Sequence, residues 1–164
     1  MTQESEMLTE NSVWFDPASG KQVEFSHIVG RILSNRQYTV HVGTDSHRVK
    51  GQLDSHMFAT VVCLYEQGKG GDYYFRRVEK HGKYGSLRQR IMEEVSHSVD
   101  VAVSLTQFVS HNRIVVHADV NSDPRHKTFN FLGQIRSWIS SVGLGFHCKP
   151  DSWASSGVAD KHAK

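Results

Sequence analysis

The sequence predicts an α/β fold built on a mixed sheet. Three β-forming runs follow one another through short polar links, which is typical of an antiparallel meander. Two further strands each follow a long amphipathic helix, and a last helix closes the chain. The expected order is therefore helix, three strands, helix, strand, helix, strand, helix, with five strands and helices on both faces. A length of 164 residues suits one domain with a single core.

The first half of the chain holds the meander. Residues 1–12 are polar and acidic and predict a flexible tail, which leaves 13–164 as the domain. Residues 16–21 (DPASGK) predict a turn, and helical spacing of apolar residues predicts a short helix over 26–33. Alternation of β-formers predicts three strands, over 38–44, 56–65 and 73–78.

The second half alternates helices and strands. Apolar residues on one face predict a helix over 86–105, and the Ile-Val-Val run within 112–118 predicts a strand covered on both faces. A second long helix is expected over 127–142, capped by Gly143, and a strand over 144–149. Pro150 ends that strand, and a last helix is expected over 152–162.

Composition limits the classes of protein that fit. No stretch approaches the ~20 apolar residues that a membrane helix requires, and the polar start does not resemble a signal peptide. Cys63 and Cys148 lie within apolar runs without zinc-binding spacing, so we expect reduced thiols and a cytoplasmic protein. A net charge of +2, from 19 basic and 17 acidic residues, is too even to indicate nucleic-acid binding by itself.

The basic residues are unevenly distributed. Between positions 76 and 90 only Glu79 opposes a run of cations, and a solvated face is the ordinary interpretation of such a run. If these side chains border an acidic site, they become candidate contacts to nucleic-acid phosphates, as does Lys161, with Lys149 a further possibility. The cations in this run are Arg76, Arg77, Lys80, Lys83, Arg88 and Arg90.

Carboxylates at the ends of distant elements are the most informative feature of the chain. Asp45 and Asp119 end two apolar runs, and they emerge at the same end of the sheet if their strands are parallel neighbours. Glu94 lies beside the apolar stripe of the 86–105 helix, whereas Glu93 lies nearly opposite, although the sequence leaves the choice between them open. Asp160 approaches from the last helix. Each acid alone has a duller role in a turn, a helix flank or an ion pair.

Clustered like charges are relieved by a hard cation. We expect Asp45, Glu94, Asp119 and Asp160 to bind Mg²⁺ or Mn²⁺, with two ions and Asp45 as the bridging ligand. Two such ions serve phosphodiester hydrolysis, because they activate a water and stabilise the leaving oxygen. Thr44, Ser46 and Asn121 are near enough in sequence to support these ligands.

Eleven histidines raise the alternative of a zinc protein. No pair has the H-E-x-x-H spacing or that of a Cys/His finger, so this hypothesis ranks third. His47 and His162 are possible proton carriers, although a surface role is the ordinary expectation for both. His117 is expected to pack or form hydrogen bonds within its strand, and Trp138 and Trp153 are expected to belong to the core.

Three motifs then resemble a known family. The segments GTDSH (43–47), HADVN (117–121) and KPDSWASSGVADKHAK (149–164) are similar to motifs of the bacterial YkuK family, in the ribonuclease H-like superfamily. The resemblance implies a five-stranded mixed sheet in the order 3-2-1-4-5. It also implies a metal-dependent, nuclease-type site made of Asp45, Glu94, Asp119 and Asp160. The loop Asn121-Ser122-Asp123-Pro124 departs from the glycine-containing loop expected there.

Two functions lead from this resemblance. The first is a magnesium- or manganese-dependent nuclease that acts on RNA, an RNA–DNA hybrid or structured DNA. The second is a non-catalytic module that binds nucleic acid or serves as a scaffold. The superfamily contains transposases, resolvases, exonucleases and inactive binding domains, so the fold does not by itself identify the reaction.

Overall fold

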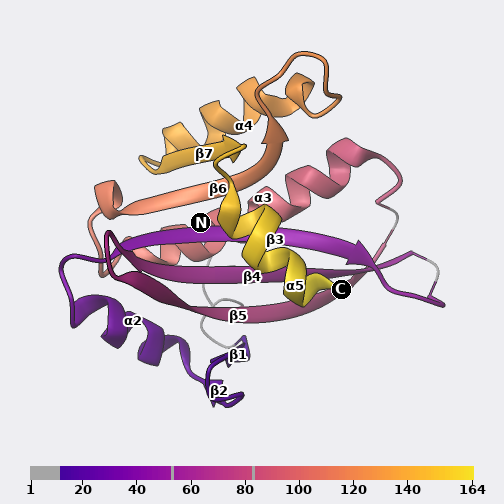
Figure 1. The fold of residues 1–164 in the computed structure, drawn as a ribbon. Coiled ribbons are helices and arrows are strands. Elements are labelled where there is room, and N and C mark those ends of the chain that lie inside the picture. The colour runs from indigo at the N-terminus through magenta and orange to yellow at the C-terminus, as the bar shows by residue number, and fades with distance from the viewer. Residues whose placement is uncertain (1–11, 53, 83) are drawn as a thin grey trace.

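A computed structural model describes residues 12–52, 54–82 and 84–164, and these residues form a seven-stranded sheet covered by helices (Figure 1). The strand order is β2-β1-β5-β4-β3-β6-β7. In chain order the strands are β1 (Trp14–Phe15), β2 (Gln22–Val23), β3 (Thr39–Arg48), β4 (Ser55–Glu66), β5 (Gly70–His81), β6 (Ile114–Asn121) and β7 (Gly145–Lys149).

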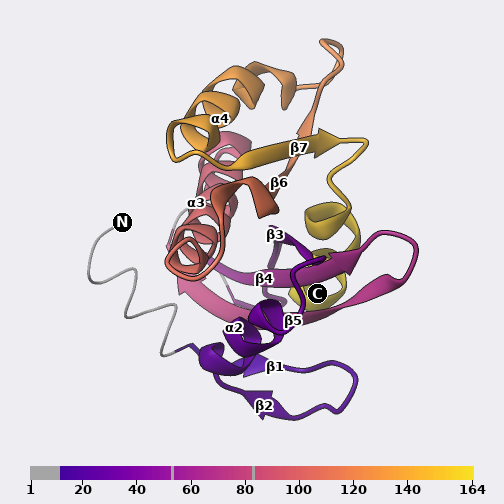
Figure 2. The ribbon, with the colours of Figure 1, turned by 90° about the vertical axis from the view of Figure 1, so that its left-hand side faces the viewer.

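The described helices lie on both sides of this sheet. They are α2 (Phe25–Leu33), α3 (Leu87–Leu105), the 3₁₀ turn η1 (His111–Arg113), α4 (Phe129–Ser141), the π-helical segment η2 (Ala154–Ala159) and α5 (Asp160–Ala163). Figure 2 shows α3 and α4 on one side of the sheet, with η2 and α5 on the other. The single last helix expected over 152–162 is instead two segments, because η2 is wound as a π-helix before α5 begins.

The predicted mixed α/β sheet is confirmed, but the predicted number of strands is wrong. The central order β5-β4-β3-β6-β7 is the expected order 3-2-1-4-5, with β3, β4 and β5 antiparallel and β6 and β7 parallel to β3. The extra strands β1 and β2 form a small hairpin that extends the β5 edge through Phe15 and Phe75. Each is two residues long, too short for any alternation of apolar and polar residues to be read.

Strand β3 is longer than the sequence indicated, and this changes where Asp45 lies. Its ladder with β4 continues to the pair Arg48 and His56, so Asp45 lies within the strand rather than after it. Alternate side chains of β3 point to opposite faces. Thr44 contacts Ser98 of α3 at 2.7 Å, whereas Gly43 lies against the backbone of η2.

The parallel pairing of β3 with β6 sets the position of the two aspartates. The recorded pairs run from Val40 with Ile114 to Gly43 with His117. Asp45 and Asp119 each follow two residues beyond that last pair, so they lie on the same face and at the same end of neighbouring strands. The register between β6 and β7 is irregular over the same stretch, between His117 and Asn121.

The main core lies between the sheet and the helices α2, α3 and α4. Val42, Leu64, Val99 and Ile114 are among its buried members, and α3 begins in a capping box at Ser86. A second, smaller cluster lies under the last helical segments and contains Val61, Cys63, Phe75, Ala154 and Ala159. The last segments are therefore held against the sheet by their own apolar contacts, which anchors the residues they carry.

The composition led to expectations about membrane helices, the two cysteines and the N-terminal residues. None of the helices in the described ranges combines the length and apolarity that a membrane crossing requires. Cys63 and Cys148 are both free thiols, and burial raises the pKa of Cys63 to about 12. The predicted tail over 1–12 lies outside the described residues apart from Ser12.

Candidate metal and nucleic-acid site

The four predicted carboxylates come from four different elements and form one electrostatic cluster. Asp45 lies on β3, Asp119 on β6, Glu94 on α3, and Asp160 opens α5. Asp160 and Asp119 both act to raise the pKa of Asp45. Asp45 and Asp119 likewise act to raise the pKa of Glu94. The ligand atoms of Asp45, His47 and Asp160 lie within 4.8 Å of one another. Glu94 and Asp119 act on the same charges but are not part of this close group.

Glu94 is the most buried of these acids, with 5% of its surface exposed. Ser46 Oγ donates a hydrogen bond of 2.6 Å to Glu94 Oε1, so the side chain reaches back to β3. Burial raises the pKa of Glu94 to about 8, and Asp45 contributes in the same direction, whereas the Ser46 hydrogen bond opposes the shift. A carboxyl held in this way is costly to ionise unless a positive charge joins it.

Glu93 has different surroundings, although it is the next residue. Its Oε1 lies 2.9 Å from Lys80 Nζ and 3.1 Å from His97 Nε2. These contacts, the His97 hydrogen bond first, lower the pKa of Glu93 to about 2. Glu94 therefore contacts β3 through Ser46, whereas Glu93 belongs to a separate ion-pair network.

His47 joins two members of the cluster. Its Nε2 lies 3.2 Å from Asp45 Oδ2 and 2.9 Å from Asp160 Oδ1. The sequence interpretation favoured a surface role for this histidine. Alternation along β3 is the signal that could have identified it, because His47 follows Asp45 by two positions and so shares its face.

Asp45 and Asp160 differ in how readily they bind a proton. Burial, followed by the hydrogen bond with Asp160, raises the pKa of Asp45 to about 6. For Asp160 burial acts in the same raising sense, but hydrogen bonds with His47 and Lys164 outweigh it and lower the pKa to about 2. Asp160 is therefore ionised over the whole range in which Asp45 titrates, and Asp45 is the member of the pair that binds a proton first as the pH falls.

Asp119 has a cation of its own. Lys149 Nζ lies 2.9 Å from Asp119 Oδ1, an oxygen that is shielded from solvent. Lys149 ends β7, beside β6, so the parallel pairing of these strands brings the two side chains together. A solvated Lys149 was the ordinary expectation from sequence, and the structure instead places it on a carboxylate of the cluster.

Of the three polar residues expected to support the cluster, Ser46 contacts one of its carboxylates. Thr44 Oγ1 instead bonds with Ser98 and Thr60, at 2.7 Å and 3.0 Å, within the interface between α3 and the sheet. Asn121 shapes the following loop, because its side chain accepts a hydrogen bond of 2.9 Å from the Asp123 N–H.

The family model described as Ribonuclease H-like matches residues 25–164. The chain belongs to the ribonuclease H-like family. The match covers every element that supplies a carboxylate to the cluster. Comparisons with curated proteins and with solved structures find no significant match.

The predicted basic residues of this ribonuclease H-like chain lie in unlike surroundings. Arg76 is 4% exposed, donates to Ser12 Oγ at 3.1 Å and lies 5.4 Å from the Trp14 ring, so it has little surface for a phosphate. Lys80 is paired with Glu93, as described above. Arg88 donates to Gln134 Oε1 at 2.7 Å on the face of α3 that meets α4. Arg77 and Lys161 are exposed, and Lys83 lies outside the described residues.

A second group of possible metal ligands lies nearer the start of β3. The ligand nitrogens of His41, His117 and His147 lie within 4.8 Å of one another. The Ala154 N–H donates to His117 Nδ1 at 3.1 Å, so in a neutral ring the proton is on Nε2, which lies 2.8 Å from His41 Nδ1. His41 Nε2 then donates to Thr39 Oγ1 at 2.9 Å.

This hydrogen-bonded chain argues against the zinc hypothesis. A metal bound at His117 Nε2 would place the ring proton on Nδ1, facing the Ala154 N–H donor. Burial lowers the pKa of His41 to about 4 and that of His117 to about 3, so both rings stay neutral and fill the chain of donors and acceptors just described. Their geometry fits a structural role that holds η2 on the sheet.

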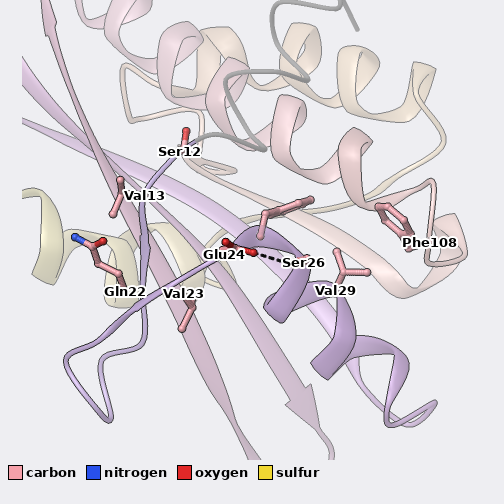
Figure 3. Close-up of a pocket in the computed structure, with 9 residues that line it drawn as sticks. Ser12, Val13, Gln22, Val23, Glu24, Ser26, Val29 and Phe108 are labelled. Atoms are coloured by element: carbon pink, nitrogen blue, oxygen red, sulfur yellow. Dashed lines mark hydrogen bonds between the residues drawn. The ribbon is translucent and has the colours of Figure 1, made fainter.

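One hollow of the molecule is remote from this chemistry. Figure 3 shows a pocket of about 800 Å³ between the β1–β2 hairpin, the start of α2 and Phe108. Glu24 is the ionisable side chain that lines it, and its Oε2 accepts a hydrogen bond of 3.4 Å from Ser26. Among the residues that the structure describes, the pocket brings no second charged group to Glu24, and they form no catalytic constellation there.

Proposed function

We propose that this ribonuclease H-like protein is a nuclease that depends on a divalent cation and hydrolyses phosphodiester bonds in RNA, an RNA–DNA hybrid or structured DNA. The observation that supports it most is the group of Asp45, His47 and Asp160, whose ligand atoms lie within 4.8 Å of one another, with Glu94 and Asp119 acting electrostatically on Asp45 or on each other. Membership of the family makes a nucleic-acid substrate the natural expectation, although members of one fold differ in their chemistry.

The donor set fits a hard cation. Carboxylate oxygens are the ligands that Mg²⁺ and Mn²⁺ prefer, and His47 adds a nitrogen that Mn²⁺ accepts more readily than Mg²⁺ does. Burial is the main cause of the raised pKa values of Asp45 and Glu94, and a bound cation would favour the ionised form of both acids. Asp45 and Asp160 would hold such a cation with His47, and Glu94 and Asp119 would add negative charge beside it.

Each residue then has a defined task. Bound cations would supply an activated water and stabilise the leaving oxygen. Ser46 orients Glu94 through its 2.6 Å hydrogen bond. His47 lies between Asp45 and Asp160, where it can hold or pass a proton beside the reacting phosphate. Lys149 neutralises part of the Asp119 charge while no cation is bound there.

A nuclease assay tests this proposal. Labelled RNA, hybrid and structured DNA are incubated with Mg²⁺ or Mn²⁺, and wild type is compared with Asp45→Asn. We expect cutting by wild type, none in EDTA, and a loss of at least a hundredfold in the variant. Asp72→Asn is the matched control, because Asp72 is exposed at the far end of β5. Undiminished cutting by Asp45→Asn contradicts the proposed mechanism.

A second function is favoured by one observation. Lys149 and Lys164 already contact Asp119 and Asp160, at 2.9 Å and 3.1 Å, so amino groups of the chain neutralise part of the cluster. In a non-catalytic binding or scaffold module such pairs would replace the metal. Calorimetric titration with Mn²⁺ separates the two functions: heat of binding that Asp45→Asn removes supports the nuclease, and no heat with or without nucleic acid supports the module.

A further inference from the structure

A groove of about 690 Å³ begins at the acidic cluster and runs along the sheet toward the end of β3. It is lined by His47, Arg48, Val49, Lys50, Met57, Arg77, Ala163 and Lys164. His47 is shared with the cluster, since its Nε2 contacts both Asp45 and Asp160. A ligand in the groove therefore has one end beside the carboxylates.

The charged lining of this groove is entirely basic. Arg48, Lys50, Arg77 and Lys164 are exposed cations that line it, and within residues 12–52, 54–82 and 84–164 no aspartate or glutamate lines it. They come from β3, the loop that follows it, β5 and the end of the chain, so the fold gathers them from separate segments. Such a lining complements a polyanion that passes from the groove into an acidic, cation-binding site.

The remaining lining is apolar. Val49, Met57 and Ala163 line the groove between the cations, and Met57 lies directly across the β3–β4 ladder from His47. A phosphate group does not bind to apolar side chains, whereas the flat face of a nucleobase packs against them. Methionine suits this contact because its side chain is flexible and polarizable.

The combination points to an unpaired strand. In a duplex the faces of the bases are covered by stacking, so a duplex presents phosphates to a protein but no free base face. A single strand offers both, and a volume of about 690 Å³ lies in the range of small-ligand sites. We propose that this groove binds a single-stranded segment of nucleic acid next to the cleavage point; that the ligand is a nucleic acid rests on the proposed function. The phosphates would contact Arg48 and Arg77, and a base would lie on Met57.

This surface differs from the one that the basic run suggested. The run 76–90 contributes Arg77 to the groove, whereas Arg76 is buried and Lys80 is paired with Glu93. Alternation along β5 is the reason, because successive side chains of one strand point to opposite faces of the sheet. The additional cations come from the end of β3 and from Lys164, which no basic run in the sequence singled out.

Binding can be measured without cleavage. Fluorescence anisotropy of a short labelled single strand and of a blunt hairpin duplex is recorded in EDTA, with Asp45→Asn as the background protein. We expect the single strand to bind more tightly than the duplex. Arg77→Ala is expected to weaken both several-fold and to lower the salt dependence by about one ion. Met57→Ala is expected to weaken the single strand alone.

Lys69→Ala is the matched control, because Lys69 is an exposed cation at the β4–β5 turn, at the opposite end of the same hairpin. The inference is overturned if Arg77→Ala and Met57→Ala bind as the Lys69→Ala control does, or if the duplex binds more tightly. These outcomes differ from failure of the proposed function, which would appear as no cleavage by the wild-type protein in Mg²⁺ or Mn²⁺. A protein that cuts but shows no effect of the groove variants refutes the groove alone.

Discussion

Gly43 and Ser155 lie in backbone contact, and this contact brings the last acid to the site. A Cβ atom on Gly43 would lie 2.6 Å from the Ser155 nitrogen, closer than real Cβ contacts occur. The π-helical segment η2 therefore packs on β3 only because residue 43 lacks a side chain. Asp160 opens the helix that follows, so the distance between Asp45 and Asp160 depends on this glycine.

Replacing Gly43 with alanine should separate these elements. We expect Gly43→Ala to lower the free energy of unfolding by about 1–3 kcal/mol, as overpacking does, and to weaken Mn²⁺ binding because Asp160 moves away. Chemical denaturation and calorimetric titration measure the two effects. Gly30→Ala is the control, because a Cβ there meets nothing within 4 Å in α2 and should be neutral or stabilising. Unchanged stability and Mn²⁺ affinity in Gly43→Ala would show that η2 adjusts freely.

Glu94 should destabilise the metal-free protein as pH rises. Its pKa is raised from 4.5 to about 8 in the folded state, so protonation favours the fold below pH 4.5 and this contribution is lost between pH 4.5 and 8. Glu94→Gln removes the titration. We expect the variant to gain stability over wild type across that range, by a few kcal/mol at most, since one pKa unit corresponds to about 1.4 kcal/mol.

Glu93 provides a control of opposite sign for this measurement. Its pKa is lowered from 4.5 to about 2, so it stabilises the fold above pH 4.5, and the benefit is lost as pH falls toward 2. Glu93→Gln should thus be less stable than wild type at neutral pH, with a gap that closes in acid. Denaturant titrations in EDTA at several pH values measure both variants. Parallel pH profiles for Glu94→Gln and wild type would refute the assigned burial effect.

Lys149 should compete with a divalent cation for Asp119. Its ammonium group lies 2.9 Å from Asp119 Oδ1, where it repels an approaching cation and occupies a ligand atom. We expect Lys149→Gln to bind Mn²⁺ several-fold more tightly than wild type in the absence of nucleic acid. Calorimetric titration measures the affinity, and Lys69→Gln should leave it unchanged. Weaker Mn²⁺ binding in Lys149→Gln would mean that Lys149 orients Asp119 rather than competing for it.

Local patterns predicted most of the fold. The long helix α3 and the strands β3 to β7 follow from apolar spacing over many residues, and the central strand order agrees with the family resemblance. The strands β1 and β2 were missed because two residues carry no period. The π-helical winding of η2 was missed too, because the spacing of apolar residues over 152–162 fits an ordinary helix.

Within the candidate site, the sequence by itself determined that carboxylates stand at the ends of elements able to converge. Tertiary structure decided which neighbours each one meets: Glu94 rather than Glu93, His47 between Asp45 and Asp160, and Lys149 on Asp119. The physical reason is the distance along the chain over which each kind of interaction acts. Periodicity reports the face on which a side chain lies relative to its own helix or strand, whereas burial, charge pairing and pKa depend on atoms that are distant in the chain and meet only through packing.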